Sequence, residues 1–97
     1  EVGFVAGKVE LFFDGQFPQA SLRPLSAVEL GKMSKADLQL MRNEIYARYG
    51  FIFKSGGAMQ AHFAKQDWYK GQYADVTPFL TELEKENLKK IQLAESK

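Results

Sequence analysis

The sequence predicts a mainly α-helical fold, a small orthogonal-type domain of four helices with a central helix over about residues 35–49 and a short N-terminal strand or hairpin. Two Ser-x-x-acid spacings, which start at Ser26 and Ser34, are typical of helix N-termini. Apolar residues recur every three or four positions along the central helix and again over residues 78–95. This spacing is expected for helices with a buried face.

The composition fits one packed domain. The 97 residues are 45% hydrophobic and include eight Phe, four Tyr and one Trp, which favours a compact core over disorder. The net charge of +1 argues against a nucleic-acid partner, because phosphate binding needs a concentrated basic surface. The lack of Cys excludes disulfides, thiolate metal ligands and Cys nucleophiles. We expect no transmembrane segment, since no apolar run approaches roughly 20 residues.

The first part of the chain differs from the rest. Strand formers fill residues 8–13, an Asp-Gly turn signal follows them, and Pro18 limits any second strand to a short edge. We therefore expect a strand or hairpin segment over residues 1–17 and a helical domain over residues 18–97. The chain starts with Glu1 rather than Met, from which we expect that an upstream segment has been removed.

The first two helices have clear start and stop signals. Ser26 and Glu29 can satisfy each other's backbone N–H groups in a capping box, and Gly31 should end this helix. Ser34 starts the second helix. We expect that helix to run to about Tyr49, because the Gly that follows favours a left-handed helix terminus.

Two more helices are predicted in the second half of the chain. Residues 51–53 (Phe-Ile-Phe) are too few for a helix and are expected to be extended and buried. A third helix fits residues 57–66. Thr77 as N-cap and Pro78 in the first turn should open the last helix, which we expect to reach about Glu95.

Polar residues interrupt the apolar pattern of the central helix. On a helical wheel its apolar residues fall on both sides, so we expect neighbouring elements to cover it. This arrangement predicts that four polar residues of the helix have little access to solvent: Arg42, Asn43, Glu44 and Arg48. A buried guanidinium requires a carboxylate, preferably in a bidentate pair.

The last helix carries matching polar residues, Glu84 and Asn87, within its apolar arc. We predict that one of the two central-helix arginines pairs with Glu84 or Glu44, and that Asn87 binds backbone groups near the central helix. We favour a structural role for this polar network over ligand binding, and we assign no catalytic residue.

A candidate ligand site is aromatic. Trp68, Tyr69 and Tyr73 lie close in sequence to Asp67. Rings offer apolar area and an acid accepts hydrogen bonds, a combination suited to sugar or peptide ligands. Packing in the core or at its rim is the alternative. A cleft lined by exposed rings would favour binding, whereas buried rings and no pocket of ligand size would favour a structural role.

No metal or cofactor is expected. His62 is the only histidine, and Asp67 and Asp75 are the only acids near it in sequence, so a solvent-exposed His outside any metal site is favoured. No Ser lies in a G-x-S-x-G turn, and one His cannot serve every role in serine catalysis. We expect that the protein is not an enzyme.

The run from Arg42 to Gly50, RNEIYARYG, closely resembles the signature of the YARHG domain family. Tyr49 stands where that signature has His, which removes a group that titrates near neutral pH. Further segments resemble the family's pattern in the right order: Ser21-x-Arg23-x-Leu25-Ser26, Leu38-x-Leu40-Met41, Gly50-Phe51-Ile52-Phe53, Phe63, Trp68-Tyr69, Leu83-Glu84-Lys85-x-Asn87 and Ile91. The resemblance covers about residues 18–95.

The resemblance implies a bacterial extracytoplasmic domain, in the periplasm or at the cell surface, behind a signal or lipoprotein peptide that has been removed. It implies a non-catalytic binding or interaction module of the cell envelope, with cell-wall glycan, peptide or an envelope protein as partner. A purely structural or accessory domain without a small ligand is the alternative. We favour a monomer.

Overall fold

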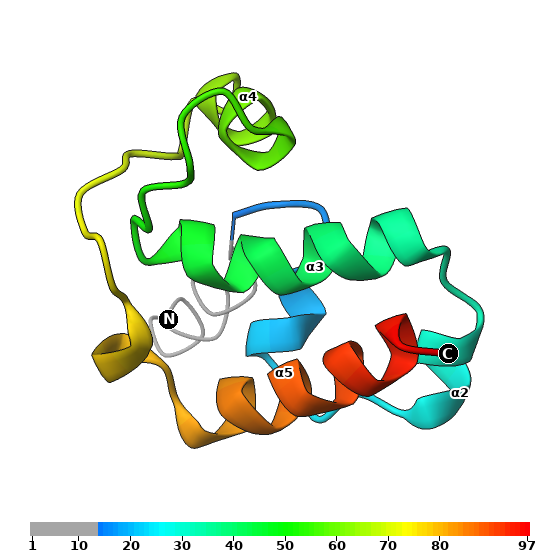
Figure 1. Ribbon diagram of the computed structural model, residues 1–97. Helices are drawn as coiled ribbons and strands as arrows, with labels where there is room; N and C mark the ends of the chain where they lie inside the picture. The colour runs from blue at the N-terminus through cyan, green and yellow to red at the C-terminus, as the bar shows by residue number, and fades with distance from the viewer. Residues whose placement is uncertain (1–13) are drawn as a thin grey trace, which may run out of the picture.

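The fold is seen in a computed structural model, which describes residues 14–97. Within this range the elements are η1 (Pro18–Ser21), α2 (Ala27–Gly31), α3 (Lys35–Arg48), α4 (Ala58–Ala64), η2 (Thr77–Phe79) and α5 (Glu82–Glu95) (Figure 1). The prediction of a mainly helical fold with four helices is confirmed, and the described residues form no sheet. Of the predicted N-terminal strand or hairpin, residues 1–13 lie outside the described part, and residues 14–17 form no strand.

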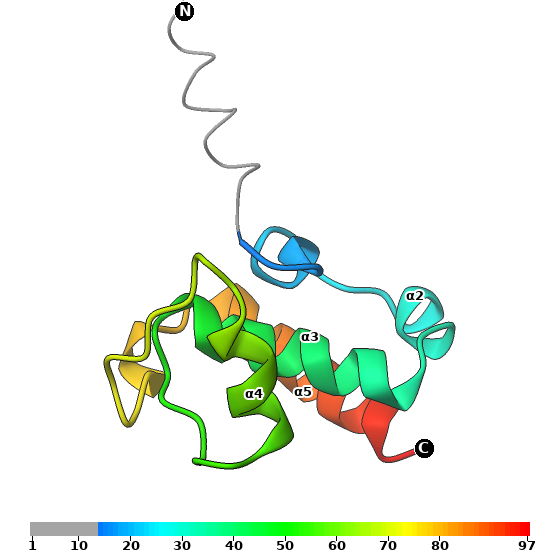
Figure 2. The ribbon, with the colours of Figure 1, turned by 90° about the horizontal axis from the view of Figure 1, so that it is seen from above.

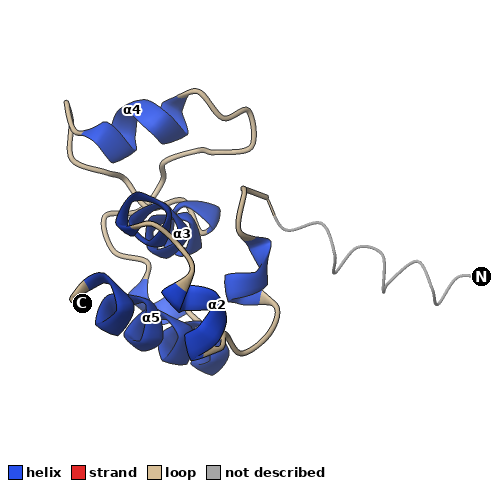
Figure 3. Cartoon of the chain, turned by 90° about the vertical axis from the view of Figure 1, so that its right-hand side faces the viewer, coloured by secondary structure: helices blue, strands red, loops and turns tan. Residues whose placement is uncertain are grey.

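α3 is the central helix, with α4 and α5 on opposite sides of it (Figures 1 and 3). One buried cluster joins α3 to η1, α2 and α5: Ala20, Leu25, Leu30, Leu38, Met41, Ile45, Leu88 and Ile91. A second cluster lies between α3 and α4 and contains Ala47, Phe53 and Phe63. The apolar residues on both sides of the predicted central helix are therefore buried by different neighbours.

α2 is short, and side-chain hydrogen bonds fix its start. Ser26 Oγ accepts from the Glu29 backbone N–H at 3.1 Å, and the Glu29 carboxylate accepts from the Ser26 backbone N–H at 2.7 Å, which is the predicted capping box. Both Glu29 oxygens also accept from Arg23 at 2.8 Å. α2 lies at the end of the molecule where α3 begins and α5 ends (Figures 1 and 2).

Glu29 makes the stability of this region depend on pH. Its hydrogen bonds with the Arg23 guanidinium and the Ser26 backbone lower the pKa of Glu29 from 4.5 to about 2. Because the folded pKa lies below the unfolded one, the ionised carboxylate stabilises the fold above its ordinary pKa, and this contribution is lost as the pH falls towards the folded value. We expect the urea midpoints of wild type and Glu29→Gln to converge as the pH is lowered from about 6 to about 2. A gap between the two midpoints that stays constant with pH would contradict this prediction.

The predicted last helix is wrong at its start. Thr77–Phe79 form the separate turn η2, and the backbone at Leu80 is then extended, with ψ of 139°. α5 begins at Glu82, because Thr81 and Glu84 form a complete capping box at this point. The Thr-Pro signal at residue 77 therefore starts only one turn, and the helix ends where predicted.

The link from α3 to α4 turns at Gly50, whose φ of 88° favours glycine. Phe51 forms an isolated parallel bridge with Tyr73. Phe53 is buried, but Ile52 is 51% exposed, so the link is buried only in part. Neighbouring side chains of an extended segment point to opposite sides, which explains this difference from the prediction. α4 is shorter at both ends than predicted.

Candidate functional site

The carboxylate of Glu44 holds the segment that precedes η1. Its two oxygens accept hydrogen bonds from the backbone N–H groups of Gln16 at 2.7 Å and Phe17 at 2.8 Å. Glu44 is 1% exposed. Gly15 has a φ of 110°, and a Cβ on it would lie 2.6 Å from Glu44 Oε1. The central helix therefore binds the incoming backbone closely through a residue of the predicted polar network.

Arg48 binds the same segment one turn further along α3. Its Nη1 donates to the Asp14 carbonyl at 2.9 Å and lies 3.5 Å from Glu44 Oε1, while its Nη2 donates to Ser21 Oγ at 2.8 Å. Burial lowers the pKa of Arg48, and the carboxylates of Glu44 and Glu84 oppose this shift. The Arg48–Glu44 pair is one of the predicted pairings. The backbone that the pair holds was not predicted.

Glu84 pairs with a tyrosine instead of an arginine. Its Oε1 accepts from the Tyr49 hydroxyl at 2.6 Å and from the Thr81 backbone N–H at 2.9 Å, and Glu84 is 2% exposed. Burial and the hydrogen bond to Glu84 raise the pKa of Tyr49 well above its usual range, so the phenol remains a donor at neutral pH. Tyr49, which replaces the signature's His, thus ties the end of α3 to the start of α5.

Asn87 binds the connector that leads from η1 to α2. Its Nδ2 donates to the carbonyls of Ala20 at 2.8 Å and Arg23 at 2.9 Å, and its Oδ1 accepts from the Leu25 backbone N–H at 3.0 Å. Ala20 belongs to η1, and Arg23 and Leu25 belong to the connector. Lys90 also donates to the Leu25 carbonyl at 3.1 Å, so two residues of α5 fix the start of α2.

Arg42 lies outside this buried network. Its Nε and Nη2 donate to the two oxygens of Glu95 at 2.6 Å and 3.0 Å, whereas Glu84 or Glu44 was predicted as the partner. The side chains of Arg42 and Glu95 are 25% and 21% exposed. Asn43 is also peripheral, since its amide donates to a carbonyl of its own helix, that of Gln39, at 2.9 Å. The polar set predicted on α3 is therefore split between buried and partly solvated positions.

The partial exposure of the Arg42–Glu95 pair limits its contribution to stability. Arg42→Met should lower the free energy of unfolding by about 1 kcal/mol, because the pair is bidentate but partly solvated. Glu95→Gln should have a similar effect, and a double-mutant cycle should give a coupling energy of about 0.5–1 kcal/mol. Urea unfolding of the four proteins measures these values. A cost above about 3 kcal/mol for either single variant would place the pair among the buried ones.

Two of the predicted aromatic residues pack around Phe63. The rings of Trp68 and Tyr69 are half-buried and each lies 5.9 Å from the Phe63 ring between centroids. The Tyr69 hydroxyl also donates to the Phe51 carbonyl at 2.5 Å. These contacts make both rings part of the second buried cluster's rim.

Tyr73 and Asp67 are more accessible. Tyr73 is 43% exposed and packs on Phe79, with ring centroids 5.0 Å apart, and Asp67 is exposed. None of the four predicted ligand residues lines either of the two pockets described below. A ligand role for the aromatic residues therefore stays a prediction.

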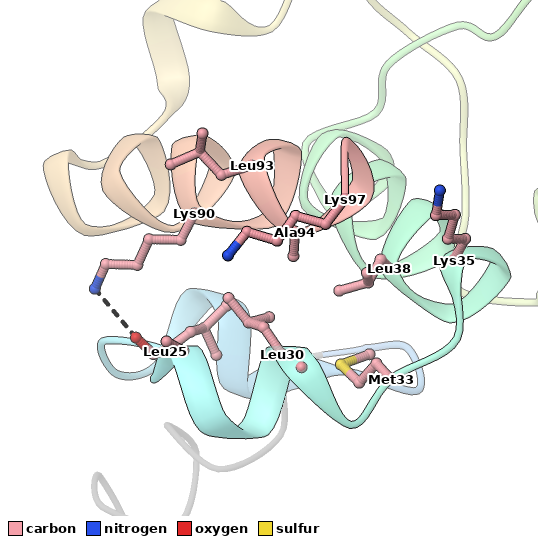
Figure 4. Close-up of a pocket in the computed structure, with 11 residues that line it drawn as sticks. Leu25, Leu30, Met33, Lys35, Leu38, Lys90, Leu93, Ala94 and Lys97 are labelled. Atoms are coloured by element: carbon pink, nitrogen blue, oxygen red, sulfur yellow. Dashed lines mark hydrogen bonds between the residues drawn. The ribbon is translucent and has the colours of Figure 1, made fainter.

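A pocket of about 570 Å³ lies between α2, the start of α3 and the end of α5 (Figure 4). Small-molecule sites commonly measure roughly 300–1,000 Å³. Its larger apolar lining residues are Leu25, Leu30, Met33, Leu38 and Leu93. Lys35, Lys90 and Lys97 also line it (Figure 4). The site thus combines an apolar wall with ammonium groups.

This pocket was not predicted, although one of its walls has a recognisable sequence pattern. Lys90, Leu93, Ala94 and Lys97 follow the three- and four-residue spacing of one helix face. Leu93 is 65% exposed, so it does not belong to the core arc of α5. The opposite wall comes from α2, which only the tertiary structure places there.

A smaller pocket of about 350 Å³ lies beside the partly solvated end of the predicted polar set. Arg42 and Asn43 line it together with Asp75 and Thr77. It carries charges of both signs, in contrast to the pocket between α2 and α5.

The structure was also searched for a metal site and for a membrane-spanning helix. His62 is half-buried and packs edge-on against Phe63, with centroids 4.8 Å apart. Across residues 14–97, no three His, Asp or Glu residues gather as a metal site would require. No helix in that range has both the length and the hydropathy needed to cross a membrane.

Comparison with known proteins identifies the family. Searches of curated proteins and of solved structures gave no significant match. The sequence model of the YARHG domain family matches residues 16–96. This match contains the signature run of α3, the connector that Asn87 holds and all of α5. The chain belongs to the YARHG domain family.

Proposed function

We propose that this domain is a non-catalytic, extracytoplasmic module of the bacterial cell envelope that binds another envelope component. Membership of the YARHG family supports the proposal, because the resemblance implies domains outside the cytoplasm. The partner classes it implies are cell-wall glycan, peptide and envelope protein. The domain would act as a monomer.

The pocket between α2 and α5 is the observation that carries the binding role. The Leu25 backbone N–H donates to Asn87 Oδ1, and Lys90 donates to the Leu25 carbonyl, so α5 fixes the chain at one wall of the pocket. Leu93 at the pocket edge is 65% exposed, so a ligand that covers it would remove apolar surface from water. A preformed apolar concavity with a few polar groups is the usual form of a binding site.

Co-sedimentation with two purified envelope fractions tests this proposal. The purified domain is mixed with peptidoglycan sacculi and, separately, with vesicles made from envelope lipids. Wild type is compared with Leu93→Asp, which places a charge in the pocket lining, and with Val28→Asp. Val28 is a matched control, since it is 68% exposed and lies outside the pocket lining.

We expect at least one fraction to retain wild type and Val28→Asp, and Leu93→Asp to be retained at least tenfold less. Circular dichroism should show that all three proteins are folded. Equal retention of the three proteins, or retention of none, would contradict a binding role for this pocket.

A purely structural or accessory domain is the second candidate function. The buried network of Glu44, Arg48 and Asn87 favours it, because each of these residues binds the protein's own backbone. Under this alternative, neither fraction would retain the domain.

A further inference from the structure

We propose that the pocket between α2 and α5 binds an anionic amphiphile, namely a single acyl chain with a carboxylate head. This inference rests on the proposed binding function and names its ligand class. The carboxylate would pair with Lys97, whose side chain points into the space between α2 and α5 (Figure 4). The acyl chain would lie along the leucines of α2 and α5.

The first argument is the apolar wall. Leu25 and Leu30 face α5 across the pocket, and Leu38 of α3 closes one end (Figure 4). An acyl chain gains stability for each methylene that it removes from water. The pocket offers such a chain continuous apolar contact between two helices.

The second argument is charge. Lys35, Lys90 and Lys97 line the pocket, and no acidic residue does. Among residues 14–97, these three lysines form no salt bridge, whereas Lys85 and Lys89 pair with Glu82 and Glu86 of their own helix. A carboxylate head would supply the negative charge that the pocket lacks.

The third argument separates an acyl chain from a peptide. The lining side chains are Leu, Ala, Met and Lys, with one Gly, and they include no carboxylate, amide or hydroxyl group. A bound peptide brings backbone N–H groups that need acceptors when they are buried. An acyl chain brings no such groups, so it fits these side chains better than a peptide does.

Calorimetric titration of the full chain with sodium dodecanoate, kept below its micelle concentration, tests the inference. We expect one site per chain, and affinity that falls about fourfold for each methylene removed in shorter alkanoates. Dodecyltrimethylammonium, with the same chain and a positive head, should bind at least tenfold more weakly. Equal affinity for the two probes would overturn the charge argument.

Charge reversal at the pocket provides the decisive variant. Lys35→Glu/Lys97→Glu should weaken dodecanoate binding at least tenfold. The control Lys54→Glu/Lys65→Glu makes the same change in net charge at exposed lysines outside the pocket lining and should bind like wild type. If both double variants lose affinity equally, the site is not the pocket, and the inference fails. Amide chemical shifts of the wild type should change mainly in the three segments that line the pocket.

Two further measurements distinguish a free amphiphile from a membrane surface, and separate failure of this inference from failure of the proposed function. If the domain sediments with phosphatidylglycerol vesicles but does not bind dodecanoate, its ligand is a membrane surface and not a single amphiphile. That result would overturn the inference. If the wild type does not bind dodecanoate but is retained on sacculi, and Leu93→Asp abolishes this retention, the ligand class is wrong and the proposed function stands. No binding in any arm would overturn both.

Discussion

Replacing Glu44 with glutamine should lower the free energy of unfolding by about 3–5 kcal/mol. Both oxygens of this buried carboxylate accept backbone N–H groups, and Oε1 also lies near Arg48. An amide offers only one acceptor oxygen, and its NH2 group would face a donor. The Arg48 guanidinium would also remain buried without the carboxylate that pairs with it. Urea unfolding followed by circular dichroism measures the change.

Glu82→Gln is the matched control for this variant. The Glu82 side chain is 89% exposed, so the same chemical change there should alter stability by less than about 0.5 kcal/mol. Gly15→Ala should reproduce part of the Glu44 effect, because its Cβ would meet the carboxylate. A cost below about 1 kcal/mol for Glu44→Gln would show that the hold on residues 14–17 contributes little to the fold.

Replacing Asn87 with leucine should cost about 3 kcal/mol or more, because two buried backbone groups and one partly buried carbonyl would lose their partner, at roughly 1–3 kcal/mol for each buried group. Asn87 is 0% exposed, so water cannot replace those bonds in the folded state without rearrangement. Leucine is close in size, and the loss therefore reports the hydrogen bonds more than packing.

Gln92→Leu tests whether a leucine on α5 is itself destabilising. Gln92 is exposed on the same helix, and its replacement should change stability by about 0.5 kcal/mol or less. Stability of Asn87→Leu close to that of wild type would show that the connector rearranges at little cost. Because the connector leads to Leu25 and α2, Asn87→Leu should also disturb the pocket, which loss of dodecanoate binding would report.

The signature of the family has a physical role in this chain. Glu44 and Arg48 bind the segment before η1, and Tyr49 binds Glu84 at the start of α5. Three successive contacts of one helix end thus hold two segments that are distant in sequence. In this chain the hydrogen bonds of the signature residues hold the fold, and the pocket that we propose as a ligand site lies at the opposite end of α3.

The helix starts that were predicted correctly depend on residues that are close in sequence. The capping box of Ser26 and Glu29 involves residues three apart, so the sequence contains all of it. The start of the last helix was predicted wrongly because two local signals compete, one at Thr77 and one at Thr81. The complete capping box belongs to Thr81. The burial of Glu44 followed from apolar residues on both sides of α3, which periodicity reveals.

The partners of the polar residues could not be predicted in the same way. Arg42 pairs with Glu95 rather than Glu84, because the axial offset between α3 and α5 decides which carboxylate lies opposite. That offset depends on how the two helices pack against each other. A helical wheel gives the direction in which a side chain points around the helix axis. It does not give the position along that axis at which a neighbouring helix makes contact.

By itself, the sequence determined the helical class, the family, most helix ends and the fact that polar groups enter the core, because each of these follows from residues near one another in the chain. Only the tertiary structure decided which groups pair, how the aromatic residues divide, and that a lysine-lined apolar pocket exists. These features join α2, α3 and α5, and the distances between helices are set by the packing of the whole core.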